Sequence, residues 1–572
     1  MSILNFSKAN CKNCYKCLRA CPVKAIKIKN EQAEIVEDLC IGCGKCLIVC
    51  PQNARKVESD VQKVKEAILK GKRVIASIAP SFVGAFHMKE EGQVVTALKN
   101  LGVTIVEETA VGAEIVADLY EKKILEKKYK NYITTCCPAA NYLVEKYFPN
   151  LTKYMIPIVS PMLAHGKILK RIYGIDSYIV FIGPCVAKKI ESIHFQHEGV
   201  VDAVITFEEL DHWLEEENIL IENLIAQEFD RSSFERGRKF PIGGILESIE
   251  ENKNDYEVLK VDGVHRCVEL FESLESGNIE NVCVEVNACR GGCVGGPGMP
   301  KKEKDFFKRQ KRVKSYTCKN ISEKNQDFHM DRSNIVFSKL FFNRAVNRKK
   351  ASEEEIKSIL RKIGKYEESD ELNCGGCGYS TCKNKAQAVY EGMAEINMCL
   401  PFMRSKAESM TNIIFEHTPN AILLIDENLN IRELNKVAEK IFNVKEYEMK
   451  DQPISIILDD YIFKNVLENK KNVIGQKIGY KQYEIVLFQS VIYLEKEKML
   501  LAIMTNITEE EKRKRELAIV KENTIEAAQK VIEKQMRVAQ EIASLLGETT
   551  AETKASLTKL KKVILQENGA LK

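Results

Sequence analysis

The chain has 572 residues, which at about 150 residues per domain predicts roughly four domains. Hydrophobic residues make up 45% and charged residues 29%, and 86 basic against 81 acidic side chains give a formal net charge of +5, which excludes a wholly disordered chain and a strongly basic nucleic-acid binder. No apolar stretch approaches about 18 residues and the start lacks a signal-peptide core, so we expect a cytoplasmic protein without a nucleic-acid or membrane partner.

Cysteine usage is the most informative part of the composition. Seventeen of the 20 cysteines fall in motifs or tight groups along the chain. In a reducing compartment such grouping indicates metal ligation, because disulfides do not persist there.

Residues 1–57 contain one cysteine pattern twice, C-x2-C-x2-C-x3-C-P. The first run is Cys11, Cys14, Cys17 and Cys21, and the second is Cys40, Cys43, Cys46 and Cys50. In such runs the first three cysteines hold one cluster and the fourth completes the other, so Cys50 is expected to join the first set and Cys21 the second. Zinc is the alternative, although it favours paired knuckles. The segment resembles a bacterial two-cluster ferredoxin, which implies two 4Fe-4S clusters and electron transfer.

Residues 58–347 have the sequence pattern of an α/β domain. Apolar runs such as 74–79 and 178–182 alternate with charged helical stretches such as 110–130, which predicts buried strands. Three cysteine motifs follow such strands: TTCCPAA at 134–140, GPCVAKKIE at 183–191 and EVNACRGGCVGGPGMP at 285–300. Ligands at strand ends suit a cofactor in a crevice, and the glycines of the last motif permit close backbone approach. The four candidate thiolates are Cys137, Cys185, Cys289 and Cys293.

In order and spacing these three motifs resemble the signatures of the catalytic domain of FeFe hydrogenases. The resemblance implies that the four cysteines hold a 4Fe-4S cluster whose Cys293 sulfur bridges to a diiron subcluster with CO, cyanide and azadithiolate ligands, the H-cluster. It also implies that Lys188 hydrogen-bonds a cyanide and that Cys136 passes protons to the bridging amine. The alternatives are a surface lysine and a small buried thiol. Ten further positions resemble those around the family's cofactor: Ala79, Pro80, Ser81, Ser160, Pro161, Gly183, Pro184, Gly243, Gly244 and Asn287.

Several positions depart from the family pattern. They are Ala140, Met162, Gly183, Ala187 and Asn287, where catalytic members have a tryptophan, a glutamine, a methionine, a serine and a methionine. The helix at 117–128 lacks glutamates at the spacing of the usual proton path, and we expect Glu121 and Glu126 to pair with Lys122 and Lys127 in solvent. These departures predict a slow or biased hydrogenase.

Other residues of this domain carry weaker signals. No two histidines have metal-ligand spacing, so we expect His87, His165, His194, His197, His212 and His265 to be satisfied surface or core residues. We expect the three remaining cysteines, Cys267, Cys283 and Cys318, to be structural. The basic run 301–319 is interpreted as a solvated helix face, with docking of an acidic electron-transfer partner as the alternative.

Residues 348–405 form the third cysteine group. Ser352 and Glu355 make a capping box that predicts a helix to about Lys365. Cys374, Cys377, Cys382 and Cys399 follow with C-x2-C-x4-C-x16-C spacing. The segment resembles a small 4Fe-4S domain of multi-domain redox proteins, with zinc as the alternative. One further 4Fe-4S cluster here is useful only if electrons or redox information leave toward the C-terminus.

Residues 406–508 resemble a PAS domain. The segment 420–444 reads as strand, turn, short strand and helix, and strands around 483–487 and 499–504 complete a five-stranded sheet. Any small α+β domain is the alternative. The absence of cysteine after residue 404, with His417 as the one histidine, excludes a cysteinyl-flavin photosensor.

Residues 509–572 are charged and helical. Ile525, Ile532, Ala539 and Leu546 recur every seven residues, which predicts a coiled coil and a homodimer, or a stripe that docks a partner. A helix folded back on its own domain is the alternative. No histidine lies between 418 and 572, so a histidine kinase with its own phosphoacceptor is excluded and a separate kinase or phosphatase is the expected signalling partner.

The complete architecture, multidomain α/β and α+β, resembles the sensory FeFe hydrogenases. The leading hypothesis is that heterolytic splitting of H2 into protons and electrons sets the redox state of the clusters, and that the PAS domain and helix report it. A ferredoxin-like carrier is the expected electron partner. The alternatives are a bidirectional ferredoxin-linked hydrogenase whose C-terminal region docks a redox partner, and a non-catalytic iron–sulfur scaffold that resembles the hydrogenase-like assembly factors.

Overall fold

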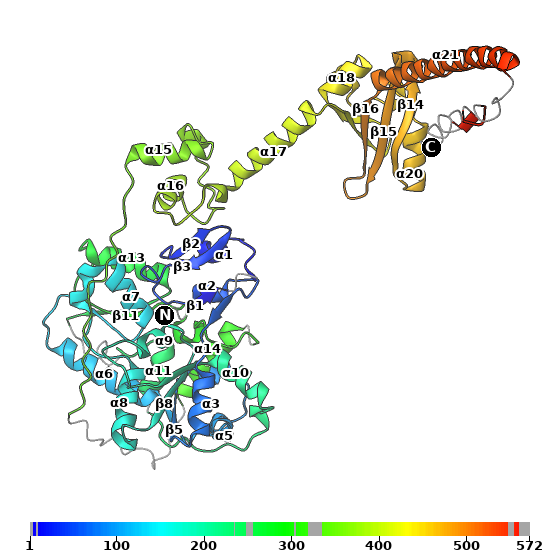
Figure 1. The fold of residues 1–572 in the computed structure, drawn as a ribbon. Coiled ribbons are helices and arrows are strands. Elements are labelled where there is room, and N and C mark those ends of the chain that lie inside the picture. Colours follow the sequence, from blue (N-terminus) through cyan, green and yellow to red (C-terminus); the bar gives the residue numbers. More distant parts are fainter. Residues whose placement is uncertain are drawn as a thin grey trace. The chain divides into compact units, whose positions relative to one another are not determined.

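The chain folds into two compact units, Met1–Met403 and Arg404–Lys572, as seen in the computed structural model (Figure 1). The structure describes residues 4–6, 10–233, 235–246, 255–302, 305–318, 334–546, 554–556 and 558–559. Both units combine helices with sheets, so the predicted fold class, with its ferredoxin, H-cluster and PAS parts, is confirmed. None of the helices in the described part of the chain is both long and apolar enough to cross a membrane.

The N-terminal segment is built from two similar halves, as the repeated cysteine pattern predicts. Strand β1 (Leu4–Phe6) pairs antiparallel with β4 (Arg55–Val57), and β2 (Ile26–Lys29) pairs antiparallel with β3 (Gln32–Ile35). Each half carries one short helix, α1 (Lys16–Ala20) or α2 (Lys45–Ile48). Leu18, Ile26 and Ile28 are fully buried between them, so a small apolar core holds the cysteine loops.

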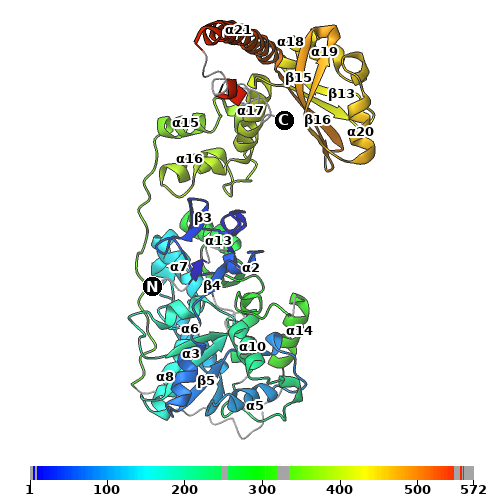
Figure 2. The ribbon, with the colours of Figure 1, turned by 45° about the vertical axis from the view of Figure 1, so that its right-hand side comes forward.

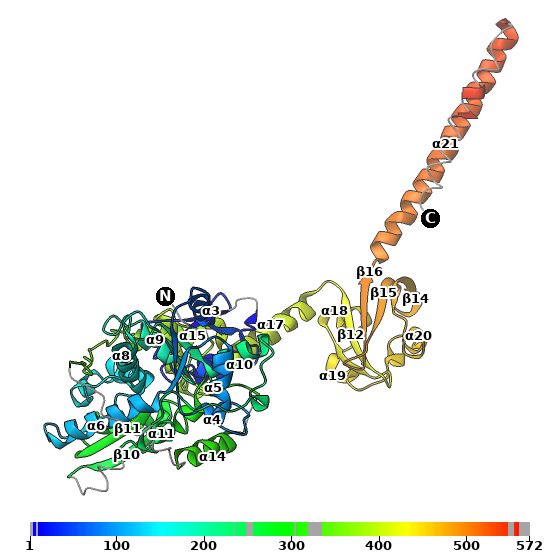
Figure 3. The same ribbon diagram turned by 90° about the horizontal axis from the view of Figure 1, so that it is seen from below.

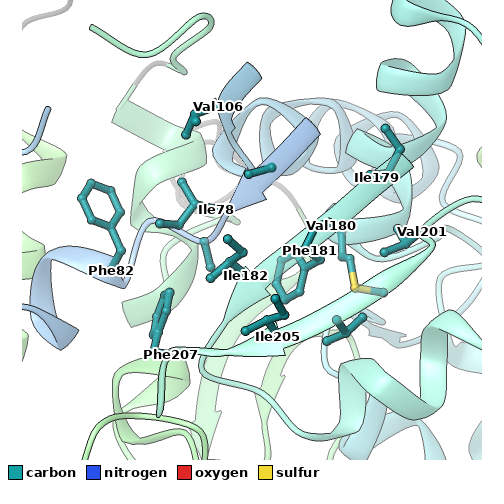
Figure 4. Packing of buried hydrophobic residues seen from close by; sticks show 14 of the residues in the cluster. Ile78, Phe82, Val106, Ile179, Val180, Phe181, Ile182, Val201, Ile205 and Phe207 are labelled. Atoms are coloured by element: carbon teal, nitrogen blue, oxygen red, sulfur yellow. The ribbon is translucent and has the colours of Figure 1, made fainter. Parts of the chain in front are cut away.

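The largest sheet of unit 1 is parallel, with strand order β6-β5-β8-β9. Its strands are β5 (Val74–Ile78), β6 (Ile105–Glu108), β8 (Tyr178–Gly183) and β9 (Ala203–Thr206). The two apolar runs singled out in the sequence are thus adjacent strands, β5 and β8. Their side chains are buried on both faces, which is typical of a parallel sheet covered by helices (Figure 4).

A second parallel sheet, with order β10-β11-β7, carries two of the three cysteine motifs. Its strands are β7 (Tyr132–Ile133), β10 (Glu257–Asp262) and β11 (Val282–Asn287). The loops that follow β7, β8 and β11 therefore all leave the carboxyl ends of parallel strands. This topology brings the three motifs to one region, as expected for ligand sites of α/β sheets.

Helices surround both sheets of this domain. They are α3 (Val61–Leu69), α4 (Phe82–Ala85), α5 (Gln93–Asn100), α6 (Ala110–Leu125), α7 (Pro138–Tyr147), α8 (Pro161–Tyr173), α9 (Ala187–Ser192), α10 (Phe207–Glu216), α11 (Glu235–Lys239), α13 (Val264–Glu275) and α14 (Phe306–Thr317). Helix α8 packs against β5 and β8 and also lies along α6. Helix α14 covers most of the basic run, and it buries Val313 and Tyr316 while its lysines face solvent.

The third cysteine group forms a small helical region with α15 (Glu353–Lys362) and α16 (Cys382–Tyr390) (Figure 2). The predicted capping box is confirmed, because Ser352 Oγ accepts from Glu355 N and the Glu355 carboxylate accepts from Ser352 N. This region packs on the N-terminal segment. Ile28 N donates to Met393 O at 2.9 Å, and Asn30 N donates to Glu395 Oε1 at 2.6 Å.

Helix α17 (Leu400–His417) leads into the second unit, whose antiparallel sheet has the order β13-β12-β16-β15-β14. The strands are β12 (Ala421–Asp426), β13 (Ile431–Leu434), β14 (Val473–Tyr480), β15 (Ile485–Leu494) and β16 (Met499–Asn506). Helices α18 (Lys436–Phe442), α19 (Glu446–Met449) and α20 (Tyr461–Asn469) complete the domain. The predicted five-stranded PAS sheet is therefore confirmed.

A single helix, α21 (Thr508–Leu546), continues from the last strand of this sheet (Figure 3). The sheet holds its first turn, because Val486 N donates to Thr508 Oγ1 at 2.9 Å and Lys477 Nζ lies 2.6 Å from Glu511 Oε1. Further along, Val531 and Ile542 are exposed to solvent. The helix is therefore anchored to its own domain only at its beginning.

Candidate active site and cluster sites

The four cysteines predicted to hold the catalytic cofactor line one cavity. Cys137 immediately precedes α7, Cys185 follows β8, and Cys289 and Cys293 follow β11. Their thiols come from three loops that are far apart in the sequence. Burial raises the pKa of Cys185 to about 11 and that of Cys293 to about 12, so thiolate ligation at this site must release protons as metal binds.

Two glycines on one side of this cavity allow segments of backbone to pack closely against each other. A Cβ atom on Gly292 would lie 2.2 Å from Pro241 O, and one on Gly296 would lie 2.5 Å from Pro184 O. No side chain fits at either position. The glycine-rich run after Cys293 therefore has the steric role that its sequence suggests.

Eight of the predicted cofactor-binding and catalytic residues also line the cavity: Ala79, Pro80, Ser81, Cys136, Pro161, Pro184, Lys188 and Asn287. Residues that the sequence analysis did not single out line it as well, among them Thr109, Phe181 and Phe240. The hydroxyl of Ser81 is buried and has no hydrogen-bond partner among the described residues. A free donor on the wall fits a cofactor that carries anionic ligands, and the four thiols fit an iron–sulfur cluster.

Four predicted cofactor-binding residues do not line the cavity: Ser160, Gly183, Gly243 and Gly244. The Ser160 hydroxyl is fully buried and donates to Glu191 Oε2 at 2.8 Å. A Cβ on Gly183 would lie 2.7 Å from the Phe181 ring, so that ring takes the space a larger side chain at 183 would need. Gly244 N donates to Glu285 Oε2 at 3.0 Å, beside the cavity.

Lys188 is a buried ammonium held by a buried carboxylate. Its Nζ donates to Glu191 Oε2 at 2.8 Å and to Cys136 O at 3.3 Å, and Lys339 Nζ lies 3.2 Å from the other oxygen of Glu191. Burial alone raises the pKa of Glu191, but the two lysine charges outweigh it and hold the pKa well below its usual range. Lys188 is therefore not the surface lysine of the alternative interpretation. Glu191 was missed as a site residue, although it ends the GPCVAKKIE motif.

Cys136 is 4% exposed and lies between the cavity and a short polar stretch. Burial raises the pKa of its thiol well above the usual value. Beyond it, Thr135 N donates to Tyr120 OH at 2.8 Å, and Thr135 Oγ1 donates to Ile156 O at 2.8 Å. This stretch ends on backbone carbonyls, which cannot pass a proton on.

The carboxylates of α6 do not continue the polar stretch behind Cys136. Glu114, Asp118 and Glu121 all bind the guanidinium of Arg236. The prediction that Glu121 and Glu126 pair with Lys122 and Lys127 is wrong, because Glu126 binds Lys123 instead. The helix folds these carboxylates against a neighbouring arginine, a partner that local sequence spacing cannot reveal.

The N-terminal cysteines divide into the two expected sets. Cys11, Cys14, Cys17 and Cys50 line one cavity. Cys43 lies near the other three: burial together with neighbouring Cys21, Cys46 and Cys40 raises its pKa to about 12. The structure therefore brings each fourth cysteine to the opposite run.

The third group also encloses a space. Cys374, Cys377, Cys382 and Cys399 line a cavity together with the buried side chain of Lys385. Throughout the described ranges, no three or more His, Cys, Asp or Glu side chains are placed to hold a single metal ion. Three of the cysteine sets line cavities: the set of the α/β domain, the third group, and the set of Cys11, Cys14, Cys17 and Cys50.

The cysteine cavities are neighbours within unit 1. A Cβ on Gly44, beside Cys43, would lie 2.6 Å from Pro297, which belongs to the glycine-rich run that follows Cys293. On the other side of the N-terminal segment, Lys24 Nζ donates to Gly378 O at 2.8 Å and Arg19 Nη1 donates to Gly376 O at 3.0 Å. The N-terminal segment thus lies between the third cysteine group and the cavity domain.

Two minor expectations fail. His197 was expected to be satisfied, but it is buried and both ring nitrogens lack a hydrogen-bond partner among the described residues. Cys318 was expected to be structural, but it is exposed, whereas Cys267 and Cys283 are fully buried. His165 is a satisfied core residue, as predicted.

Comparisons with known proteins agree with this domain order. Residues 5–57 match the 4Fe-4S dicluster domain, 72–297 the C-terminal domain of the iron-only hydrogenase large subunit, 370–401 an Fe-S cluster family and 410–476 the PAS domain. Iron hydrogenase 1 of Clostridium pasteurianum is 28% identical over 301 residues, which cover 42% of this chain and 52% of that protein. The NADP-reducing hydrogenase subunit HndD of Solidesulfovibrio fructosivorans is 25% identical over 367 residues, which cover 54% of this chain and 59% of that protein.

The chain thus spans little more than half the length of these two relatives. Among solved structures, a variant of the FeFe hydrogenase HydA1 from Chlamydomonas reinhardtii aligns with a TM-score of 0.41 and 19% identity, over 50% of this chain and all of that one. The family matches cover each cysteine set in turn. The chain is therefore an FeFe hydrogenase-like protein in which an iron-only hydrogenase large-subunit domain is combined with iron–sulfur domains and a PAS domain.

Proposed function

We propose that this protein is a hydrogen-sensing FeFe hydrogenase of low turnover. The observation that carries the proposal is the cavity with four cysteine thiols, Lys188, Cys136 and the free hydroxyl of Ser81 on its wall, in a chain that continues into a PAS domain. A scaffold without a diiron site has no use for a buried ammonium and a free donor facing such a cavity. The assembly-factor alternative is therefore disfavoured.

The residues of the cavity have distinct roles in this proposal. Cys137, Cys185, Cys289 and Cys293 would hold the 4Fe-4S part of an H-cluster, and Cys293 would also bridge to its diiron part. When bound, that cofactor supplies the reversible heterolytic cleavage of H2. Lys188, fixed by Glu191, and Ser81 offer hydrogen-bond donors toward anionic ligands, and Cys136 holds a proton at the cavity wall.

Electrons would move through the N-terminal segment in either direction. This segment, whose cysteines would hold two 4Fe-4S clusters, lies between the cavity domain and the third cysteine group, which would hold one further cluster. A ferredoxin-like carrier is the proposed external partner. This arrangement gives electrons a branch toward the C-terminal part of the chain, which a simple hydrogenase does not need.

The redox state would be reported by the PAS domain and α21. The first turn of α21 is held by strand β14 through Lys477 and Glu511, so a change in the sheet has a direct mechanical route into the helix. The exposed apolar side chains of α21 are available to a second copy of the chain or to a cytoplasmic kinase or phosphatase. A homodimer is the form we propose.

A bidirectional, ferredoxin-linked hydrogenase is the second candidate. The buried lysine, the cysteine at 136 and the intact set of four thiols would serve it equally. Turnover separates the two functions. The Phe181 ring beside Gly183 and the absence of carboxylates beyond Cys136 along that stretch favour slow chemistry.

Infrared spectroscopy of the matured full chain under H2 and then argon tests the proposal. We expect CO and cyanide stretches that shift reversibly at low H2. Hydrogen–deuterium exchange of residues 508–546 under the same two gases should differ for the sensor. Fast H2 evolution with reduced ferredoxin and unchanged exchange would favour the second candidate, and absent CO and cyanide bands would overturn both.

A further inference from the structure

A chain of hydrogen bonds runs from the cavity wall toward the protein surface, separately from Cys136. Thr109, which lines the cavity, lies with its Oγ1 2.7 Å from Ser77 Oγ, and Ser77 Oγ lies 2.8 Å from His165 Nδ1. On the far side of the ring, His165 Nε2 lies 3.0 Å from Glu107 Oε2. Tyr173 OH then donates to Glu107 Oε1 at 2.6 Å. Every link is a normal hydrogen-bond length.

The fold brings these five residues together from three segments of the chain. Ser77 on β5 and Glu107 on β6 are direct partners in the parallel sheet, and Thr109 follows β6. His165 and Tyr173 lie two turns apart on α8. Helix α8 approaches closely because α6 has Gly112 there, where a Cβ would lie 2.7 Å from His165 Cβ. The link between β6 and α8 therefore depends on tertiary packing.

The inner residues of this hydrogen-bond chain are buried from solvent, whereas its outer end is partly exposed. Glu107 and His165 are 0% exposed and Ser77 is 1% exposed, whereas Tyr173 at the end of α8 is only half-buried. Ser77, His165 and Glu107 are in direct hydrogen-bond contact, so a proton can pass between them without a bridging water. Tyr173 is the point at which the line meets water.

The carboxylate fixes the direction of the bonds. Burial raises the pKa of Glu107, but hydrogen bonds from His165 and Tyr173 and the charge of Arg231 outweigh it and leave the pKa below its usual value. An ionised Glu107 only accepts, so His165 Nε2 donates to it, and in the neutral ring Nδ1 then accepts from Ser77. Ser77 in turn accepts from Thr109. The oxygen of Thr109 therefore keeps a lone pair for a proton from the cavity.

We propose that Thr109, Ser77, His165, Glu107 and Tyr173 form a proton relay between the cavity and the surface. The inference rests on the proposed hydrogenase function and assigns it a second proton route. The stretch behind Cys136 ends on backbone carbonyls and the carboxylates of α6 bind Arg236, so neither supplies an acid that leads outward. In the relay every member can both donate and accept at the required atoms.

A proton that leaves the cavity binds Thr109 Oγ1, and the original hydroxyl proton of Thr109 passes to Ser77 Oγ. The Ser77 proton passes to His165 Nδ1, and the imidazolium gives its Nε2 proton to Glu107 Oε2. The carboxyl group turns to donate to the oxygen of Tyr173, whose own proton leaves to solvent. One proton enters, one leaves and no electron moves. Rotation returns the hydroxyl groups and the carboxyl to their starting positions, whereas His165 is left with its proton on Nδ1 in place of Nε2. A proton that passes inward along the same links, in the reverse order, returns His165 to its starting tautomer.

The test compares Thr109→Val, which removes the hydroxyl at constant shape, with Thr109→Ser, which keeps it. Full-length matured variants are assayed for H2 oxidation, and their infrared difference spectra between H2 and argon are recorded in light and heavy water. We expect Thr109→Val to lower turnover about tenfold or more while Thr109→Ser stays within about threefold. We also expect a deuterium-sensitive carboxyl band in the parent that is absent in Glu107→Gln.

Thr96→Val makes the same change at a buried threonine whose hydroxyl donates to Ile225 O, outside the relay, and should leave turnover unchanged. The CO and cyanide stretches of Thr109→Val should match those of the parent, which separates proton transfer from cofactor loss. Parent-like turnover of Thr109→Val, or a carboxyl band that persists in Glu107→Gln, would overturn the relay alone. A parent without CO and cyanide bands would overturn the proposed function and the relay together.

Discussion

The ammonium of Lys188 and the carboxylate of Glu191 form a 2.8 Å ion pair in which both side chains are at least nine-tenths buried. Glu191 also accepts from Ser160 and pairs with Lys339. One carboxylate thus compensates two lysines, one of which faces the cavity. The geometry of the donor at the cavity wall depends on a residue that does not line the cavity itself.

Glu191→Gln is expected to destabilise the first unit by about 3 kcal/mol, because it leaves two buried ammonium groups without a counter-charge. Urea denaturation followed by circular dichroism measures the change. Glu216→Gln is the matched control, since Glu216 is exposed and its pair with Lys65 lies at the surface. Equal stability of the two variants would contradict a structural role for the buried pair.

The pairing of cysteines across the N-terminal repeat gives a second prediction. Cys50→Ala should remove the cluster of Cys11, Cys14 and Cys17, and Cys21→Ala should remove that of the second run. Iron analysis should show the loss of one cluster in each variant, and electron paramagnetic resonance of the reduced proteins should show loss of different signals. Cys43 of the second run lies near Cys289 of the cavity domain. Cys21→Ala should therefore slow electron exchange with the cavity domain more than Cys50→Ala does. Identical spectra would argue against the crossed pairing.

Local patterns predicted the cysteine sets because the cysteines fall in short motifs that can be recognised without knowledge of tertiary contacts. The strands β5 and β8 and the capping box at Ser352 were predictable for the same reason. The contact of His165 with Glu107 was not, because it joins a helix to a neighbouring strand 58 residues away. The sequence shows neither the register that pairs β5 with β6 nor the close approach at Gly112.

The loop of the third cysteine group packs so tightly on the N-terminal segment that Gly378 has no room for a side chain. Its φ of +95° already disfavours other residues, and a Cβ would lie 2.8 Å from Leu18. Gly378→Ala should therefore loosen this contact, raise hydrogen exchange of residues 374–382 and lower the occupancy of the third cluster. Gly392→Ala is the control: its φ is +71° but nothing lies within 4 Å of the new atom, so it should carry only backbone strain of about 1 kcal/mol. Equal exchange in the two variants would count against the packing argument.

His194 and His197 should make the stability of the first unit depend on pH. Burial lowers the pKa of each to about 4 from 6.5, helped by the charges of Arg344 and Lys339 at His194 and of Lys339 and Lys167 at His197. Between these two pKa values the unfolded chain binds more protons, so the free energy of unfolding falls as the pH falls. After allowance for solvent screening, the expected loss is about 1 to 2 kcal/mol, seen as a lower urea midpoint at about pH 5.5 than at about pH 7. The double variant His194→Gln, His197→Gln should flatten this slope, whereas His212→Gln, at an exposed position, should retain it. A slope that persists in the double variant would assign the pH dependence to other groups.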